Sequence, residues 1–263
     1  MQNGTKPQRI SRLDFDFLKT FHPQIVAGAA APQFPNEYLT DKVGDKPDQN
    51  ADGLPYGCTS YATSKIARIL GIPNATVNSI EAITQSNKRG GYGILAAIDA
   101  ARTQLGWFKW RYIIQAKGNL DWFAAHQLAQ VSGIPEMRAI SVGLPWFKSW
   151  EDAALRGIKL MPMPTADELA QVHSSPNSIG WHDATLDGWS QNFTEAPGTL
   201  LYRLQSWQGT IDYLYLDRAV MNVVFDLYGT VSVTGTNLDV LPAKVPLPDW
   251  FWSLWHSWLG YAY

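Results

Sequence analysis

The residue of this chain with the clearest chemical potential is its single cysteine, Cys58. It opens a segment, residues 58–71, in which apolar and aromatic side chains recur at helical spacing. Pro55 and Gly57, just before it, indicate a turn. We therefore predict a helix that begins at Cys58. Unpaired backbone N–H groups and the positive end of the helix dipole favour a thiolate there, so we expect a reactive, partly exposed thiol with a depressed pKa.

A thiolate becomes a catalyst only beside an acid–base group, and histidine is the commonest one. Of the five histidines, His182 stands out because it begins residues 182–189, an alternating segment typical of a strand, which would hold an imidazole rigidly. The later run Gln205-Ser206-Trp207 supplies an amide that can orient an imidazole and an indole that can shield it. The set His173, His182 and Asp183 matches no zinc-ligand spacing, so we expect neither a metal nor a cofactor.

Two kinds of element must position these residues. Helical periodicity covers residues 58–71, 92–105 and 119–131, and alternation typical of strands covers residues 137–144, 182–189, 199–206, 211–216 and 229–234. Helices come first and strands later, which favours an α+β domain over alternating βαβ units.

Composition excludes several classes of function. The net charge of −2 gives no electrostatic reason to expect a nucleic-acid partner. No apolar run reaches the roughly 20 residues that a transmembrane helix needs. The first residues lack the apolar stretch of a signal peptide, and one cysteine excludes an internal disulfide. We therefore expect a cytoplasmic or virion-associated protein rather than a secreted one.

Four short segments resemble sequence motifs of the papain-like cysteine peptidases, above all those of bacterial and viral members, and they occur in the same order along the chain. Residues 48–50 (Asp-Gln-Asn) are similar to the family's Asp-Gln-Gly, and residues 57–62 (Gly-Cys-Thr-Ser-Tyr-Ala) to its nucleophile segment. Residues 181–184 (Trp-His-Asp-Ala) are similar to Gly-His-Ala, and residues 205–209 (Gln-Ser-Trp-Gln-Gly) to Asn-Ser-Trp-Gly. The numbers of residues that separate Cys58 from His182 and from Gln205 are close to the roughly 130–150 residues found in that family.

The resemblance implies an α+β, papain-like fold, in which an N-terminal helical lobe packs its nucleophile helix on a C-terminal antiparallel sheet or barrel lobe. It also implies hydrolysis of peptide bonds, with a peptide or protein as substrate. Cys58 would be the nucleophile and His182 the acid–base group, oriented by Gln205. Gln49 would stabilise the oxyanion together with the Cys58 N–H, and Trp207 would support the site.

The sequence departs from that pattern at two of these positions. Gln49 lies nine residues before Cys58, farther than in the family, so Asn50 is the alternative oxyanion donor. Gln205 stands where the family has Asn. Two other functions therefore stay open: a catalytically silent papain-like protein that binds peptide or builds a structure such as a virion, and an amidase or acyl transferase with the same Cys–His order.

The composition along the chain predicts four regions. These are an N-terminal extension (1–34), the papain-like domain (35–234), a proline-rich linker (235–249) and an aromatic tail (250–263). Seven of the last 14 residues are aromatic, which is more apolar area than a solvated tail tolerates. We expect the tail to pack on its own domain, on a protein partner or at an interface.

Overall fold

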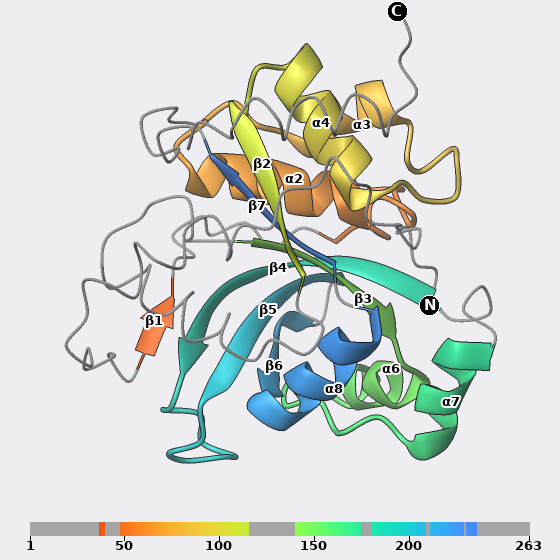
Figure 1. Cartoon of the computed structure of the whole chain (residues 1–263), viewed down its shortest axis with the longest axis vertical. Helices are drawn as coiled ribbons and strands as arrows, with labels where there is room; N and C mark the ends of the chain where they lie inside the picture. The colour runs from red at the N-terminus through yellow and green to blue at the C-terminus, as the bar shows by residue number, and fades with distance from the viewer. Residues whose placement is uncertain are drawn as a thin grey trace, which may run out of the picture.

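Helices and antiparallel strands form the described part of the molecule. The structure is a computed structural model, and it describes residues 37–39, 48–115, 140–174, 180–208, 211–228 and 230–235. Helices α2 (Cys58–Ile69), α3 (Val77–Thr84) and α4 (Ile94–Gln104) lie together on one side (Figure 1). Helices α6 (Lys148–Leu155), α7 (Ala166–Ser174) and α8 (Arg218–Tyr228) lie on the other side of the strands.

The strands form one seven-stranded sheet with the order β2-β7-β3-β4-β5-β6, and β1 pairs with β4 outside this path. Their bounds are Glu37–Leu39 for β1, Trp110–Gln115 for β2, Ile140–Trp146 for β3, Gly180–Ser190 for β4, Leu201–Gln208 for β5, Ile211–Asp217 for β6 and Thr230–Gly235 for β7. Every pairing between these strands is antiparallel. The predicted α+β class, with helices packed on an antiparallel sheet, is confirmed.

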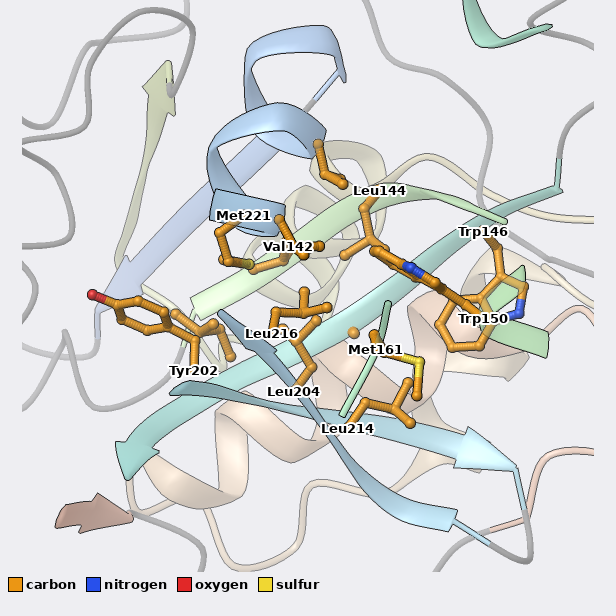
Figure 2. Packing of buried hydrophobic residues seen from close by; sticks show 14 of the residues in the cluster. Val142, Leu144, Trp146, Trp150, Met161, Tyr202, Leu204, Leu214, Leu216 and Met221 are labelled. Carbon is orange, nitrogen blue, oxygen red and sulfur yellow. The ribbon is translucent and has the colours of Figure 1, made fainter. Parts of the chain in front are cut away.

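Alternation along the central strands divides the sheet into an apolar and a polar face. In the middle of β3 and β4, side chains of even number such as Val142, Leu144 and Leu186 are buried in one large apolar cluster, which Trp181 and Trp189 near the ends of β4 also join. Helices α6 and α8 close this cluster, through Trp150 and Met221 among others (Figure 2). The helical layer has an apolar cluster of its own between α2, α3 and α4. The two clusters share no residue, because the sheet face towards α2 is polar.

Gly188 marks a close approach between β1 and β4. Leu39 is its register partner in β1, and the register between β4 and β5 shifts at this point. A Cβ atom at this glycine would lie 2.1 Å from the carbonyl oxygen of Tyr38, a distance that no real contact shows. Only glycine therefore fits here without moving β1.

The sequence located most of these elements but missed several short ones. Helices 58–71 and 92–105 correspond to α2 and α4, and the predicted strands correspond to β3, β4, β5, β6 and β7. The strand predicted over 137–144 runs to residue 146, and α3, α6, α7, α8, β1 and β2 were not predicted. The predicted helix 119–131, extension 1–34 and tail 250–263 lie outside the described residues, as does the linker except for residue 235. In the described ranges, no helix is long and apolar enough to cross a membrane.

Candidate active site

Cys58 is the first residue of α2, as predicted. Gly57 precedes it without a side-chain cap, and the first turn contains no acidic residue. The positive end of the helix dipole is therefore not neutralised by this helix's own side chains. The thiol is 0% exposed rather than partly exposed, because Tyr61, Ala62 and Leu54 pack around it.

Helix α2 contacts α3, the segment before α4 and the sheet. Thr59 Oγ1 donates to the carbonyl oxygen of Tyr92 at 3.1 Å, and Ser60 Oγ donates to Glu81 Oε2 at 2.9 Å. These residues therefore face α3 and the segment before α4. Cys58, Tyr61 and Ala62 form a small buried cluster against which Leu54 and Val77, the first residue of α3, pack. The helix as a whole also packs against β4 and β3.

Gln49 closes the turn that leads to Cys58. Its backbone oxygen accepts from Leu54 N at 2.7 Å, and its Nε2 donates to the carbonyl oxygen of Pro55 at 3.2 Å. The side chain is fully buried, and within the described residues its Oε1 has no hydrogen-bond partner. Asn50 is exposed, and its backbone N–H donates to Asp48 Oδ1 at 2.9 Å. The Gln49 amide thus supports the backbone before the nucleophile, and its role as oxyanion donor, like that of Asn50, stays a prediction.

Two carboxylates and one amide fix this loop against the helices. Asn87 Oδ1 accepts from Tyr56 N at 3.1 Å, and the Asn87 backbone N–H donates to Glu81 Oε1 at 2.7 Å. The Tyr61 hydroxyl donates to Asp52 Oδ2. Burial and this hydrogen bond raise the pKa of Tyr61, which keeps its hydroxyl protonated as a donor. The start of α2 is therefore held rigidly from both sides.

His182 lies on the apolar face of β4. Its ring packs edge-to-face on Trp146, with the ring centroids 4.8 Å apart, and Trp146 in turn contacts Trp150 of α6. The imidazole is 0% exposed, and among the described residues neither ring nitrogen has a hydrogen-bond partner. Burial lowers the pKa of His182 to about 3, so the ring is neutral at physiological pH.

The strand register places Gln205 on the other face. Thr185 of β4 is the direct neighbour of Gln205 on β5 and of Ser141 on β3, so these three side chains lie on one face. His182 precedes Thr185 by three residues and therefore lies on the opposite face. The structure thus brings Gln205 to the side of the sheet that α2 covers, while His182 is hydrogen-bonded to neither Gln205 nor Cys58. Trp207 belongs to β5, and its side chain lies outside the described part of the chain.

The polar face contains buried groups that the sequence reasoning did not single out. Ser141 Oγ donates to Asp183 Oδ1 at 2.7 Å. Burial raises the pKa of Asp183 well above its ordinary range, and the hydrogen bond from Ser141 offsets part of this rise. Arg203 holds Asp187 with two hydrogen bonds, of 2.8 and 2.9 Å. The alternation of Asp183, Thr185 and Asp187 with apolar residues was the available signal. Within the described residues, no three His, Cys, Asp or Glu side chains gather as metal ligands would.

Comparison with known proteins gives the fold of this arrangement. No protein-family model and no curated protein sequence matches the chain. Xylellain, a cysteine protease from Xylella fastidiosa, superposes with a TM-score of 0.62 at 12% identity, over 90% of this chain and 96% of its own. A procathepsin B from Trypanosoma congolense superposes with a TM-score of 0.56 at 10% identity, over 90% of this chain and 87% of its own.

A procathepsin L 3 from the larval midgut of Tenebrio molitor also superposes, with a TM-score of 0.52 at 10% identity, over 89% of this chain and 76% of its own. At such identities the likeness concerns the fold alone. The chain therefore has the papain-like cysteine-protease fold, which confirms the fold that the sequence resemblance implied.

Proposed function

We propose that this protein is a cysteine peptidase in which Cys58 is the nucleophile. The observation that carries the proposal is the place of the only cysteine, at the first residue of α2 in a papain-like fold, with no acidic residue in the first turn. A thiolate there would attack the carbonyl carbon of a peptide bond and form a thioester as the C–N bond breaks and the amine leaves with a proton. Water then hydrolyses the thioester, which breaks the C–S bond, releases the carboxylic acid and restores the thiol. Peptides or proteins would be the substrates.

The version expected from the sequence pairs Cys58 with a His182 imidazolium that Gln205 orients. In the described arrangement His182 of β4 and Gln205 of β5 lie on opposite faces of the sheet. A strand shift of one residue would exchange the two faces. This version of the acid–base chemistry therefore requires a rearrangement that brings His182 to the side of the sheet where Gln205 lies.

A catalytically silent papain-like protein is the second candidate. The observation that favours it is burial, because Cys58 and His182 are both 0% exposed. Such a protein would bind a peptide or build an assembly without turning over a substrate. It would contain a cysteine that reacts as an ordinary buried thiol.

The test measures hydrolysis of a mixed peptide library together with alkylation of the full-length chain by iodoacetamide as a function of pH. A peptidase should hydrolyse peptides, lose this activity in Cys58→Ala without a change in melting temperature, and alkylate at a rate that persists well below the pH at which ordinary thiols ionise. No hydrolysis and an alkylation rate that rises only above about pH 8 would establish the silent protein instead. Hydrolysis of non-peptide amides alone would assign the amidase alternative.

A further inference from the structure

Asn87, three residues after the end of α3, is bonded to the turn that precedes Cys58 through both ends of its side-chain amide. Its Oδ1 accepts from Tyr56 N at 3.1 Å, and its Nδ2 donates to the carbonyl oxygen of Gly53 at 3.2 Å. One of these bonds needs an acceptor on the side chain and the other needs a donor. A side chain that carries both on one planar group, as an amide does, can therefore make both bonds.

The carboxylate of Glu81 holds Asn87 and the first turn of α2 together. Its Oε1 accepts from the Asn87 backbone N–H at 2.7 Å. Its Oε2 accepts from Ser60 Oγ of α2 at 2.9 Å and also from Ser86 Oγ. Both serines are 0% exposed, so water does not compete for their hydroxyl groups. We call Glu81 and Asn87 together the clamp.

Cys58 lies midway between the two points that the clamp holds. Tyr56 precedes the cysteine by two residues and Ser60 follows it by two, and each is hydrogen-bonded to the clamp. Gly57, between Tyr56 and Cys58, is the N-cap of α2 and has no side chain with which to cap the helix. The start of the helix therefore depends on bonds supplied from outside it, and the clamp supplies them on both sides of the thiol.

We propose that Asn87, held by Glu81, is a positioning residue for Cys58 that keeps the first turn of α2 in the geometry that stabilises a thiolate. The inference rests on the proposed function, because it names the group that sets the reactivity of the nucleophile assigned there. A thiolate at a helix start is stabilised by the N–H groups and the dipole of the first turn, and both depend on a well-formed turn. A looser turn should let the thiol ionise more like a cysteine in water.

The amide of Asn87 carries no charge, so its removal acts on the thiol through geometry alone. Charged and titratable groups come to the start of α2 from several elements. They are Asp52 in the preceding turn, Tyr61 and Lys65 in α2, Glu81 in α3, and Asp183 and Asp187 in β4, on which α2 packs. Replacement of Asn87 by alanine changes none of these side chains. A shift in the ionisation of the thiol therefore reports the turn and not a lost charge.

The test measures the ionisation of the thiol in the full-length chain. Because the chain has one cysteine, the ultraviolet absorbance of the thiolate against pH, after subtraction of the Cys58→Ala curve, follows a single group. We expect the wild type to ionise below the ordinary thiol midpoint of about 8.5, and Asn87→Ala to move the midpoint upwards by about one pH unit or more. Asn87→Asp should not restore it, because a carboxylate accepts from Tyr56 N but cannot donate to Gly53 O, and it adds a negative charge.

Hydrolysis of a peptide substrate gives the second readout. Asn87→Ala should lower kcat by about tenfold or more and change KM little, because the clamp acts on the nucleophile and not on the bound peptide. Ile98→Val is the matched control. It removes a methyl group from the apolar cluster between α2, α3 and α4, and so lowers the melting temperature without removing a bond of the clamp. It should leave the midpoint and kcat unchanged.

Three results would overturn the inference: an unchanged midpoint in Asn87→Ala, an equal upward shift in Ile98→Val, or a rise in KM at unchanged kcat, which would place Asn87 in substrate binding. If Asn87→Ala does not fold, Ser60→Ala decides, because it removes one bond to Glu81 and no charge. An upward shift there supports the clamp, and an unchanged midpoint overturns it. A failure of the proposed function looks different, since the wild type itself would ionise as an ordinary thiol and hydrolyse nothing, which would overturn both proposals.

Discussion

The two faces of β4 differ in how they are stabilised, although their residues alternate along one strand. On one face Ala184, Leu186 and the neutral His182 are buried against the apolar side chains of α6 and α8. On the other face Asp183 and Asp187 are buried just as completely, through hydrogen bonds and an ion pair. The apolar face needs only well-fitting neighbours, whereas the polar face needs specific partners for each group.

Strand β4 therefore contributes to apolar packing through one face and presents polar groups on the other. The apolar face holds the sheet together and contains the residue that resembles a catalytic histidine. The polar face lies under α2 and contains the buried ionisable residues Asp183, Asp187 and Arg203. Substitutions of adjacent residues therefore probe two different environments at almost the same place.

The largest effect is expected at the buried ion pair of the polar face. Asp187→Ala leaves the Arg203 guanidinium 7% exposed and without its carboxylate, so we expect the free energy of unfolding to fall by about 3–5 kcal/mol. Urea denaturation measures this loss. The double variant Asp187→Ala with Arg203→Met should recover most of it, because no charge is then left buried. A double variant as unstable as the single one would mean that this face depends on shape and not on pairing.

The adjacent residue on the apolar face should respond differently. Leu186→Ala removes a fully buried side chain from the large cluster, so we expect a loss of about 3 kcal/mol from transfer and cavity terms together. Leu186→Met keeps the volume and should cost less than about 1.5 kcal/mol. The same denaturation measurement applies. An equal loss of stability in Leu186→Met and Leu186→Ala would show that buried apolar volume alone does not explain the contribution of Leu186.

The two faces should also give opposite pH dependences of stability. The folded protein keeps His182 neutral down to about pH 3, whereas the unfolded chain binds a proton near pH 6.5. The unfolded state thus binds more protons in this window, and His182 makes the free energy of unfolding rise with pH by up to about 1.4 kcal/mol per unit. Asp183 acts in the other direction, because its raised pKa makes the folded state bind the extra proton above pH 3.8.

Single variants separate the two contributions. His182→Gln should remove the rise and leave a free energy of unfolding that falls as pH increases above 3.8, while Asp183→Asn should steepen the rise up to pH 6.5. Chemical denaturation at pH 4, 5, 6 and 7 measures both slopes. A wild-type slope that survives in His182→Gln would contradict a neutral, buried imidazole on the apolar face.

Sequence patterns were sufficient for the fold class and for the elements that carry the site. Helix α2, its start at Cys58 and the strands around His182 and Gln205 follow from periodicity and from the turn at Gly57. Helices such as α3 and α7 were missed because they span only 8 and 9 residues, which is too short for a clear helical period. Helix α8 was missed because the sequence pattern predicted a strand on either side of it.

The arrangement of the site was less predictable. The order of Cys58, His182 and Gln205 is visible in the sequence. Whether His182 and Gln205 lie on the same face of the sheet depends on the register between β4 and β5. That register is set by the pairing of Thr185 with Gln205, far apart in the chain, and by the shift near Gly188. The burial of Cys58 likewise depends on how Leu54 and Tyr61 close over it, which no local pattern records.

The most direct test of this account uses the fact that the chain has one cysteine. His182→Cys places a second thiol on β4, and a disulfide forms only if its Cβ atom lies within about 3.5–4.5 Å of that of Cys58. After mild oxidation, mass spectrometry of unreduced peptides reports the bridge. We predict no bridge to residue 58 in His182→Cys, because residue 182 lies on the face of β4 that packs on Trp146 and not on the face towards α2. A bridge in His182→Cys would contradict the assignment of the two faces of β4.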